Sequence, residues 1–236
     1  MPHVIQIEAM MLQYSLANHV YTCVDGDQVV ILDLKRDKYL YVPRAEFRAL
    51  VSRMTATAGD SDTQSCEPTL LRGFIERGLL TNHRGGRRHL EAKDYPAATE
   101  SLRQGPGYVT FAEVSRFFVS ASFAFASLRL TPLQQVVDGV AHRRKVSAGS
   151  DAVDRNCCRE RMRAFHRMRP LFPRDNSCLF DSLALLRFLT FYGQFPRWVF
   201  GVQMGPFAAH CWVQSKDLVL NDELEHVRSY NPIMIV

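Results

Sequence analysis

The stretch CLFDSLALLRFLTFYGQ, residues 178–194, places a cysteine directly before an apolar segment with helical spacing. The first turn of a helix leaves backbone N–H groups unpaired, and the helix dipole is positive there, so both stabilise a thiolate. Asp175, Asn176 and Ser177 precede the cysteine and are suitable N-cap residues. The sequence therefore predicts Cys178 as a nucleophile at a helix start, not as one more buried thiol.

A strand-like segment downstream, FAAHCWV at residues 207–213, supplies a histidine. Alternation along a strand puts His210 and Trp212 on one face and Cys211 on the other, so we expect Cys211 to point away from the reaction. Asp222, at the end of LVLND, ends the next strand and is the acid expected to orient the imidazole. Each residue alone is more often structural, but the ordered set predicts a catalytic Cys178, His210 and Asp222 triad.

Helical patterns also precede this stretch, at residues 111–128, 132–145 and 153–168, and we expect a second domain to open with them near Gly107. The segment 153–169 is rich in arginine. We interpret it first as a solvated helix face, with an acidic patch on a peptide substrate or partner enzyme as the alternative. The polar stretch 81–100 is predicted to be a linker.

The N-terminal part of the chain has a different pattern. Residues 19–42 predict three short antiparallel strands broken by DGD and KRDK turns, and helices are expected after Pro43 and at residues 69–80. Residues 55–67 are polar and loop-like. The predicted fold class is α+β, with a small domain of three strands and helices at residues 1–90 and a second domain at residues 96–236.

The motifs CLFDSLALLRFL, H-x-W-V and L-N-D resemble the leader peptidase of lasso-peptide biosynthesis, the B protein, whose catalytic domain is transglutaminase-like. The resemblance implies Cys178 as nucleophile, His210 as general base and acid, and Asp222 as the orienting acid. It also implies a winged-helix-like, PqqD-like element at residues 1–90 that binds the leader of a ribosomally made precursor peptide, and a transglutaminase-like or papain-like fold for residues 96–236. The resemblance further implies a partner cyclase, the asparagine-synthetase-like C protein, which would close the macrolactam.

A disordered leader can bind by adding a strand to an exposed sheet edge. The third strand, KYLYVP, and the helix at residues 70–80 would form the two walls of such a groove. The candidate leader-binding residues are Tyr39, Leu40, Tyr41, Leu71, Phe74 and Ile75. Alternation puts Tyr39 and Tyr41 on one face of the strand and leaves open which face is exposed.

Composition limits the other functions. The 236 residues, 47% hydrophobic and 22% charged, are ordinary for a soluble globular protein. Residues 117–128 are the longest uncharged apolar stretch and are shorter than a membrane span, and no secretory signal is evident, so we expect a cytoplasmic protein. The six cysteines show no CxxC spacing, so no metal, cofactor or disulfide framework is expected, and the adjacent Cys157 and Cys158 are interpreted as structural.

Two alternatives to a peptidase stay open. The same triad could transfer the acyl group to an amine, as a transglutaminase does, or the fold could serve as a peptide-binding adaptor without catalysis. Nucleic-acid binding is not expected, because the basic residues lie outside the winged-helix segment and phosphate binding would not explain the triad.

Overall fold

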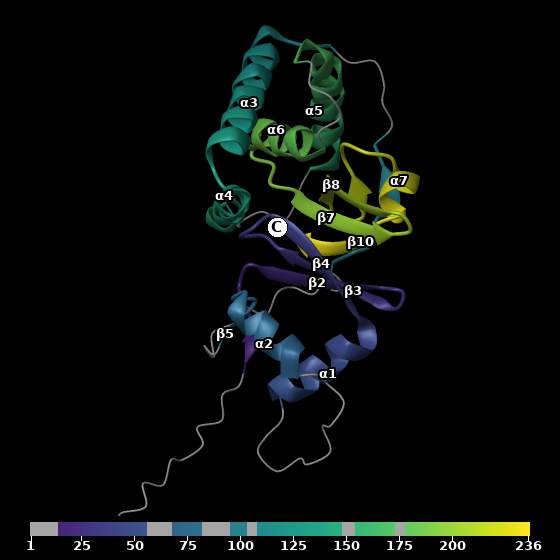
Figure 1. Ribbon diagram of the computed structural model, residues 1–236. Coiled ribbons are helices and arrows are strands. Elements are labelled where there is room, and N and C mark those ends of the chain that lie inside the picture. The colour runs from purple at the N-terminus through teal and green to yellow at the C-terminus, as the bar shows by residue number, and fades with distance from the viewer. Residues whose placement is uncertain (1–13, 56–67, 82–94, 103–107, 148–153, 173–177) are drawn as a thin grey trace, which may run out of the picture. The chain divides into compact units, whose positions relative to one another are not determined.

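The computed structural model describes residues 14–55, 68–81, 95–102, 108–147, 154–172 and 178–236 (Figure 1). The chain divides into two compact units, one of Met1–Asp33 with Tyr39–Arg88 and one of Leu34–Lys38 with His89–Val236. The first contains a small sheet with two helices and the second a larger sheet with several helices, so the predicted α+β class holds. We describe each unit by itself.

The N-terminal unit contains the three predicted strands, which form a sheet in the order β2-β3-β4. Its elements are β1 (Ser15–Leu16), β2 (Val20–Asp25), β3 (Gln28–Asp33), β4 (Lys38–Pro43), α1 (Arg44–Thr55), α2 (Pro68–Glu76) and β5 (Leu80–Thr81). The core contains Val29 and Ile31 of β3, Leu50 of α1 and Phe74 of α2. Residues 56–67, predicted as a loop, lie outside the described residues.

The second helix is shorter than the sequence predicted. It ends at Glu76, and Leu80 already belongs to β5, which pairs antiparallel with β1. The N–H of Leu79 donates to the carbonyl of Phe74 and that of Gly78 to Ile75, with Gly78 at φ +66°. This pattern closes a helix at a left-handed glycine, so the glycine of RGLL marks the helix end.

The C-terminal unit is built on a five-stranded sheet in the order β10-β7-β8-β9-β6. Its strands are β6 (Glu100–Ser101), β7 (Arg197–Met204), β8 (Phe207–Ser215), β9 (Leu218–Val219) and β10 (Asn231–Ile235). The pairs β10-β7, β7-β8 and β8-β9 are antiparallel, and β6 runs parallel to β9. On one edge β8 pairs with β7 along its length, whereas on the other edge β9 pairs with Gln214 and Ser215. The earlier part of this second edge therefore faces other segments of the chain.

Helix α6 forms the centre of this unit, and contacts both β8 and α3 (Figure 1). The helices are α3 (Phe111–Leu130), α4 (Leu133–Val146), α5 (Arg155–Met168), α6 (Cys178–Thr190) and α7 (Leu224–Arg228), with a 3-10 turn at Arg169–Leu171. From Phe180 to Leu189 almost every side chain of α6 is buried, which explains why the stretch is apolar on all sides. Phe188 packs on Phe165 of α5, with ring centroids 5.6 Å apart.

The predicted linker at residues 81–100 extends too far, because residues 95–99 pack against the C-terminal unit and Glu100–Ser101 form strand β6 of its sheet. The side-chain amide of Gln214 donates to the carbonyl of Pro96 over 2.9 Å, and the hydroxyl of Tyr95 donates to the carbonyl of Gln214. Tyr95 and Ala98 pack against Val199 and Trp212. The sequence did not predict this, because the segment is polar and its strand β6 is only two residues long.

Helix α3 is long and apolar enough, by length and composition alone, to cross a membrane, although the sequence analysis expected no span. In this unit one side of α3 is buried, including Phe117, Ser120, Ala121 and Ala124. Its first turn carries the buried Glu113, whose carboxylate accepts a 2.7 Å hydrogen bond from Arg161 of α5. The helix thus packs against the C-terminal unit with one side, while Phe118, Val119 and Phe125 remain exposed.

The arginine-rich helix α5 uses several of its charges within the unit. Arg155 pairs with Glu100 and Asp217, and Arg159 lies 3.7 Å from Glu100. The guanidinium of Arg161 also lies over the ring of Tyr192, 4.4 Å from its centroid. These contacts connect α5 to β6 and to the turn that follows α6. The arginines of α5 therefore do more than form a solvated helix face.

Candidate active site

Cys178 is the first residue of α6 and is half-buried. A hydrogen bond with the side chain of Cys211 has the largest effect on its pKa; burial opposes it, and hydrogen bonds from His210 and the backbone N–H of Cys211 lower the pKa further, to about 4. The predicted N-cap residues 175–177 lie outside the described residues. The thiol is therefore held as a thiolate near neutral pH.

Cys211 does not point away from Cys178, contrary to the sequence prediction. The alternation on β8 is as expected, but α6 packs on the face that carries Cys211. Cys211 is 2% exposed, and its sulfur lies 3.9 Å from the hydroxyl of Ser182, one turn along α6 from Cys178. Burial and the neighbouring Cys178 raise the pKa of Cys211, so it stays a thiol that donates to Cys178.

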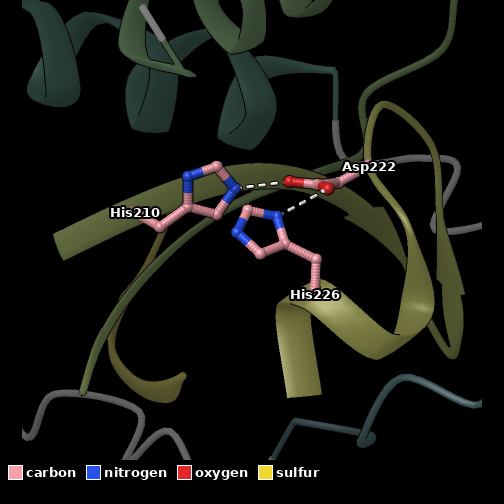
Figure 2. A group of neighbouring side chains, drawn as sticks. All are labelled: His210, Asp222 and His226. Atoms are coloured by element: carbon pink, nitrogen blue, oxygen red, sulfur yellow. Dashed lines mark hydrogen bonds and ion pairs between the residues drawn. The ribbon is translucent and has the colours of Figure 1, made fainter. Parts of the chain in front are cut away.

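His210 lies on β8, and its Nε2 pairs with Oδ2 of Asp222 (Figure 2). Because Nε2 is taken, Nδ1 is the nitrogen left for the hydrogen bond with Cys178. Burial lowers the pKa of His210, but the hydrogen bonds with Asp222 and Cys178 outweigh it and raise the pKa to about 9. With Cys178 anionic and His210 cationic, the pair matches the resting state of a thiol nucleophile and its base.

The imidazole of His210 is enclosed by aromatic rings. The ring centroids of Tyr230 and Trp212 lie 5.2 Å and 6.1 Å from it. Gly201, which pairs with His210 across β7 and β8, makes room for this packing, because a Cβ there would lie 2.9 Å from both Trp212 and Tyr230. The orientation of His210 is thus fixed by packing as well as by Asp222.

Asp222 follows β9, and its two carboxylate oxygens have separate partners. Oδ2 forms the hydrogen bond with His210. Oδ1 accepts a 2.7 Å hydrogen bond from the backbone N–H of Glu223 and a 2.9 Å hydrogen bond from Nδ1 of His226. Burial raises the pKa of Asp222, but these hydrogen bonds outweigh it and the net pKa is lowered. Asp222 is therefore ionised beside a cationic His210.

A buried polar network connects the segments that carry the three residues. Asn221 accepts from the N–H of Val213 over 2.7 Å and donates to Ser182 over 3.1 Å, and Ser182 donates to the carbonyl of Cys211. These bonds join α6, strand β8 and the residue directly before Asp222. The sequence analysis missed both Asn221 and Ser182, although a serine in so apolar a helix was a signal.

His226 is a third residue that the sequence did not predict, after Asn221 and Ser182. It stands four positions after Asp222 on α7, at helical spacing, and its ring centroid lies 4.7 Å from that of His210. Figure 2 shows both imidazoles directed at the same carboxylate. Ligand atoms of His210, Asp222 and His226 all lie within 4.8 Å of one another, so these residues could hold a metal ion, a possibility absent from the sequence prediction.

Other charged groups surround the cysteine. Asp181, three residues after Cys178, pairs with Arg169, whose Nη2 lies 3.1 Å from Oδ2 of Asp181. Burial raises the pKa of Asp181, and the negative charge of Cys178 adds to this effect. His166 of α5 has a pKa lowered by burial.

The candidate leader-binding residues lie in the N-terminal unit, separate from the triad. Phe74 is 5% exposed and belongs to the core, so it does not offer a surface to a peptide; Leu40 and Leu71 pack on the same core. Tyr41 and Ile75 are exposed, and Tyr39 is half-buried. The outer face of the edge strand β4 is thus the one with the tyrosines.

Fold and site together define a domain in which a cysteine at a helix start faces a histidine on a strand and an acid in the turn that follows the next strand. Residues 121–235 match the family model described as the transglutaminase-like superfamily. This part of the chain is therefore a transglutaminase-like core domain, which indicates cysteine-protease or transglutaminase-type activity. The comparisons with curated proteins and with solved structures find no match.

Proposed function

We propose that this protein is a cysteine peptidase that binds the leader of a ribosomally made lasso-peptide precursor and cleaves it from the core peptide. The observation that carries the catalytic part is the arrangement of Cys178, His210 and Asp222, in which the thiol is ionised and His210 is held between the other two. The transglutaminase-like match agrees with it.

The proposed chemistry is acyl transfer through a thioester. The Cys178 thiolate attacks the scissile carbonyl, and backbone N–H groups at the start of α6 are the candidates to stabilise the oxyanion. The imidazolium of His210 gives its Nδ1 proton to the departing amine as the C–N bond breaks. His210 then takes a proton from water, whose oxygen displaces Cys178 and releases the acid.

Substrate choice is assigned to the N-terminal unit. It contains a three-stranded sheet whose edge strand β4 presents Tyr39 and Tyr41, and a leader can pair with such an edge. The resemblance of the site motifs to lasso B proteins supports a leader peptide as the ligand and an asparagine-synthetase-like cyclase as the next enzyme. The N-terminal unit then raises the local concentration of the scissile bond at Cys178.

A second candidate function is acyl transfer to an amine, because the same thioester can react with an amine in place of water. The match to the transglutaminase-like superfamily favours keeping it. The two reactions differ in the product, since hydrolysis leaves a free carboxylate on the leader and transfer leaves an amide.

The test incubates the full chain with a synthetic precursor and follows the products by mass spectrometry. We expect leader and core fragments, with the mass of one water added, for the wild type and none for Cys178→Ala. Adding a primary amine distinguishes transfer, since a product heavier by that amine identifies the second candidate. Cleavage by Cys178→Ala at the wild-type rate would exclude Cys178 as nucleophile.

A further inference from the structure

Two histidines and one carboxylate converge beside the proposed nucleophile, and the peptidase mechanism uses only one of the histidines (Figure 2). His226 keeps 49% of its side chain exposed, whereas His210 and Asp222 keep 13% and 15%. The group is therefore open to solvent on the His226 side and enclosed on the other. A fourth ligand such as water has access from the His226 side.

The ligand set matches one class of ion. Zn²⁺ binds imidazole nitrogen and carboxylate oxygen at about 2.0–2.2 Å in tetrahedral sites, which puts neighbouring ligand atoms roughly 3.3 Å apart. Here Nδ1 of His226 lies 2.9 Å from Oδ1 of Asp222, and all three ligand atoms are within 4.8 Å. Of the three residues only His226 lies on the short helix α7, and its half-exposed side chain is the one with room to adjust to zinc geometry.

The surrounding charge also favours a cation. Asp222 is followed by Glu223 and Glu225 in the same segment, and Arg228 pairs with Glu225 over 3.4 Å. We propose that His210, Asp222 and His226 form a Zn²⁺ site, completed by water, and that zinc bound there reversibly inhibits the peptidase. The binding stands on this geometry alone, while the inhibition rests on the proposed function.

Inhibition follows from which nitrogen the ion takes. Zinc at Nε2 of His210 displaces the proton shared with Asp222, and that proton leaves to solvent. The imidazole then carries one proton, on Nδ1, and could release it only by becoming an imidazolate, which makes it a far weaker acid than an imidazolium. The amine leaving group is no longer protonated, although Cys178 stays in place.

The binding test uses the full chain, without a histidine tag, in the Cys178→Ala background so that the nucleophilic thiol cannot bind metal. Co²⁺ serves as a spectroscopic probe and Zn²⁺ is titrated in competition with a chromophoric chelator. We expect one ion per chain, with visible bands typical of four-coordinate Co²⁺ and no sulfur-to-cobalt charge-transfer band, because the ligands are nitrogen and oxygen.

Variants locate the site. His226→Ala and Asp222→Asn should each weaken Zn²⁺ binding by at least about tenfold, since even outer partners of metal ligands contribute that much. His142→Ala is the matched control, because His142 is an exposed histidine on α4, and it should bind as before. Circular dichroism of each variant checks the fold, and His226→Gln is the second variant if His226→Ala fails to fold.

The inhibition test measures precursor cleavage against free Zn²⁺, each protein normalised to its own rate in chelator. Wild type should lose activity and regain it with chelator, and His226→Ala should need at least about ten times more zinc. Unchanged Zn²⁺ affinity in both site variants, or a sulfur charge-transfer band, would overturn the proposed site. Zinc binding without loss of cleavage would overturn only the inhibition, and a zinc-free wild type that cleaves nothing would instead refute the proposed function.

Discussion

At the scale of single residues, Asp222 is the member of the proposed triad whose role is easiest to test separately. Its carboxylate accepts hydrogen bonds from His210 on one oxygen and from His226 on the other. Asp222→Asn leaves one oxygen, so its amide must face one of these imidazoles, and it cannot stabilise the imidazolium.

We expect Asp222→Asn to lower single-turnover cleavage by roughly 10- to 10³-fold, less than the 10⁴ of the analogous serine-protease change, because the thiolate needs less help. His210→Ala should be slower still, since it removes the base. Leader affinity, measured by fluorescence anisotropy, should stay constant in both. A wild-type cleavage rate for Asp222→Asn would make Asp222 a turn residue only.

Cys211 gives a second prediction, opposite to what strand alternation alone suggests. Its thiol donates to the Cys178 thiolate, and a hydrogen bond to a charged group is worth about 1.5–3 kcal/mol. Cys211→Ala should therefore raise the pH at which the rate of Cys178 alkylation by iodoacetamide is half-maximal by roughly one to two pH units. Labelling across pH 3–8, read by peptide mass spectrometry, measures this.

Cys211→Ser is the matched control, because its hydroxyl keeps a donor in the same place. The sign follows from the depressed pKa of Cys178: below it the thiol is protonated and unreactive, and losing a donor moves that limit upward. Identical pH profiles for wild type and Cys211→Ala would show that the backbone N–H and His210 alone hold the thiolate.

The sequence predicted three candidate site residues, which the structure brings together, but it did not predict their surroundings. Cys178 at a helix start, His210 on a strand and Asp222 shortly after the next strand carry side chains whose chemistry makes them recognisable. Alternation predicts only which residues share a face of a strand. Whether Cys211 lies near Cys178 depends on which face of β8 is covered by α6, and alternation does not predict that. Asn221 stands inside the quoted motif L-N-D, but its contacts with Val213 and Ser182 depend on the fold. No local pattern marked His226, which reaches Asp222 from α7.

At the scale of elements, helix α3 is fixed at its start by Glu113, which is 4% exposed. One carboxylate oxygen accepts from the N–H of Thr110 over 2.8 Å in a capping box, and the other from Arg161 over 2.7 Å. Burial raises the pKa of Glu113, but the hydrogen bonds from Thr110 and Arg161 outweigh it and lower the pKa below its ordinary 4.5.

This shift makes stability depend on pH. A carboxyl group whose pKa is lower in the folded state stabilises the fold above its unfolded value, near 4.5, and loses that contribution as the pH falls through the folded value. We expect Glu113→Gln to lower the free energy of unfolding by about 1–3 kcal/mol at pH 7 and to reduce its decline between pH 5 and 3. Urea unfolding at several pH values tests this.

The control is Glu160→Gln, an exposed glutamate on α5, which should change stability by less than about 0.5 kcal/mol at pH 7. If Glu113→Gln and Glu160→Gln unfold alike at pH 7 and at pH 4, the buried ion pair with Arg161 contributes nothing measurable to the unfolding free energy.

Element prediction succeeded where periodicity was long and failed where it was short. The strands β2, β3 and β4 and the helices α3 to α6 follow alternation or helical spacing over several residues. The two-residue strands β5 and β6 have no period to detect, and they form because partners in the same sheet complete their hydrogen bonds. For the same reason the linker prediction ran past residue 95. The predicted strand at LVLND does form, but as β9 it covers only Leu218 and Val219.

At the scale of the whole molecule, the proposed function divides the work between the two units, with leader binding in the first and cleavage in the second. The exposed residues of the candidate leader surface are Tyr41 on β4 and Ile75 on α2, 47% and 39% exposed. Val24, 45% exposed on β2 at the other edge of the same sheet, offers a matched control.

We expect Tyr41→Ala and Ile75→Ala in the full chain to weaken leader binding by about 1–2 kcal/mol each, five- to thirtyfold, because each removes apolar area that a docked peptide would cover. Val24→Ala should bind as the wild type does, and residues 1–90 alone should bind the leader without cutting it. Fluorescence anisotropy with a labelled leader measures all four.

Since Tyr41, Ile75 and Val24 are distant from Cys178 in sequence and belong to the other unit, cleavage of saturating precursor should stay unchanged. Binding that survives Tyr41→Ala and Ile75→Ala but is lost from the 1–90 fragment would place the leader on the C-terminal unit and refute this division.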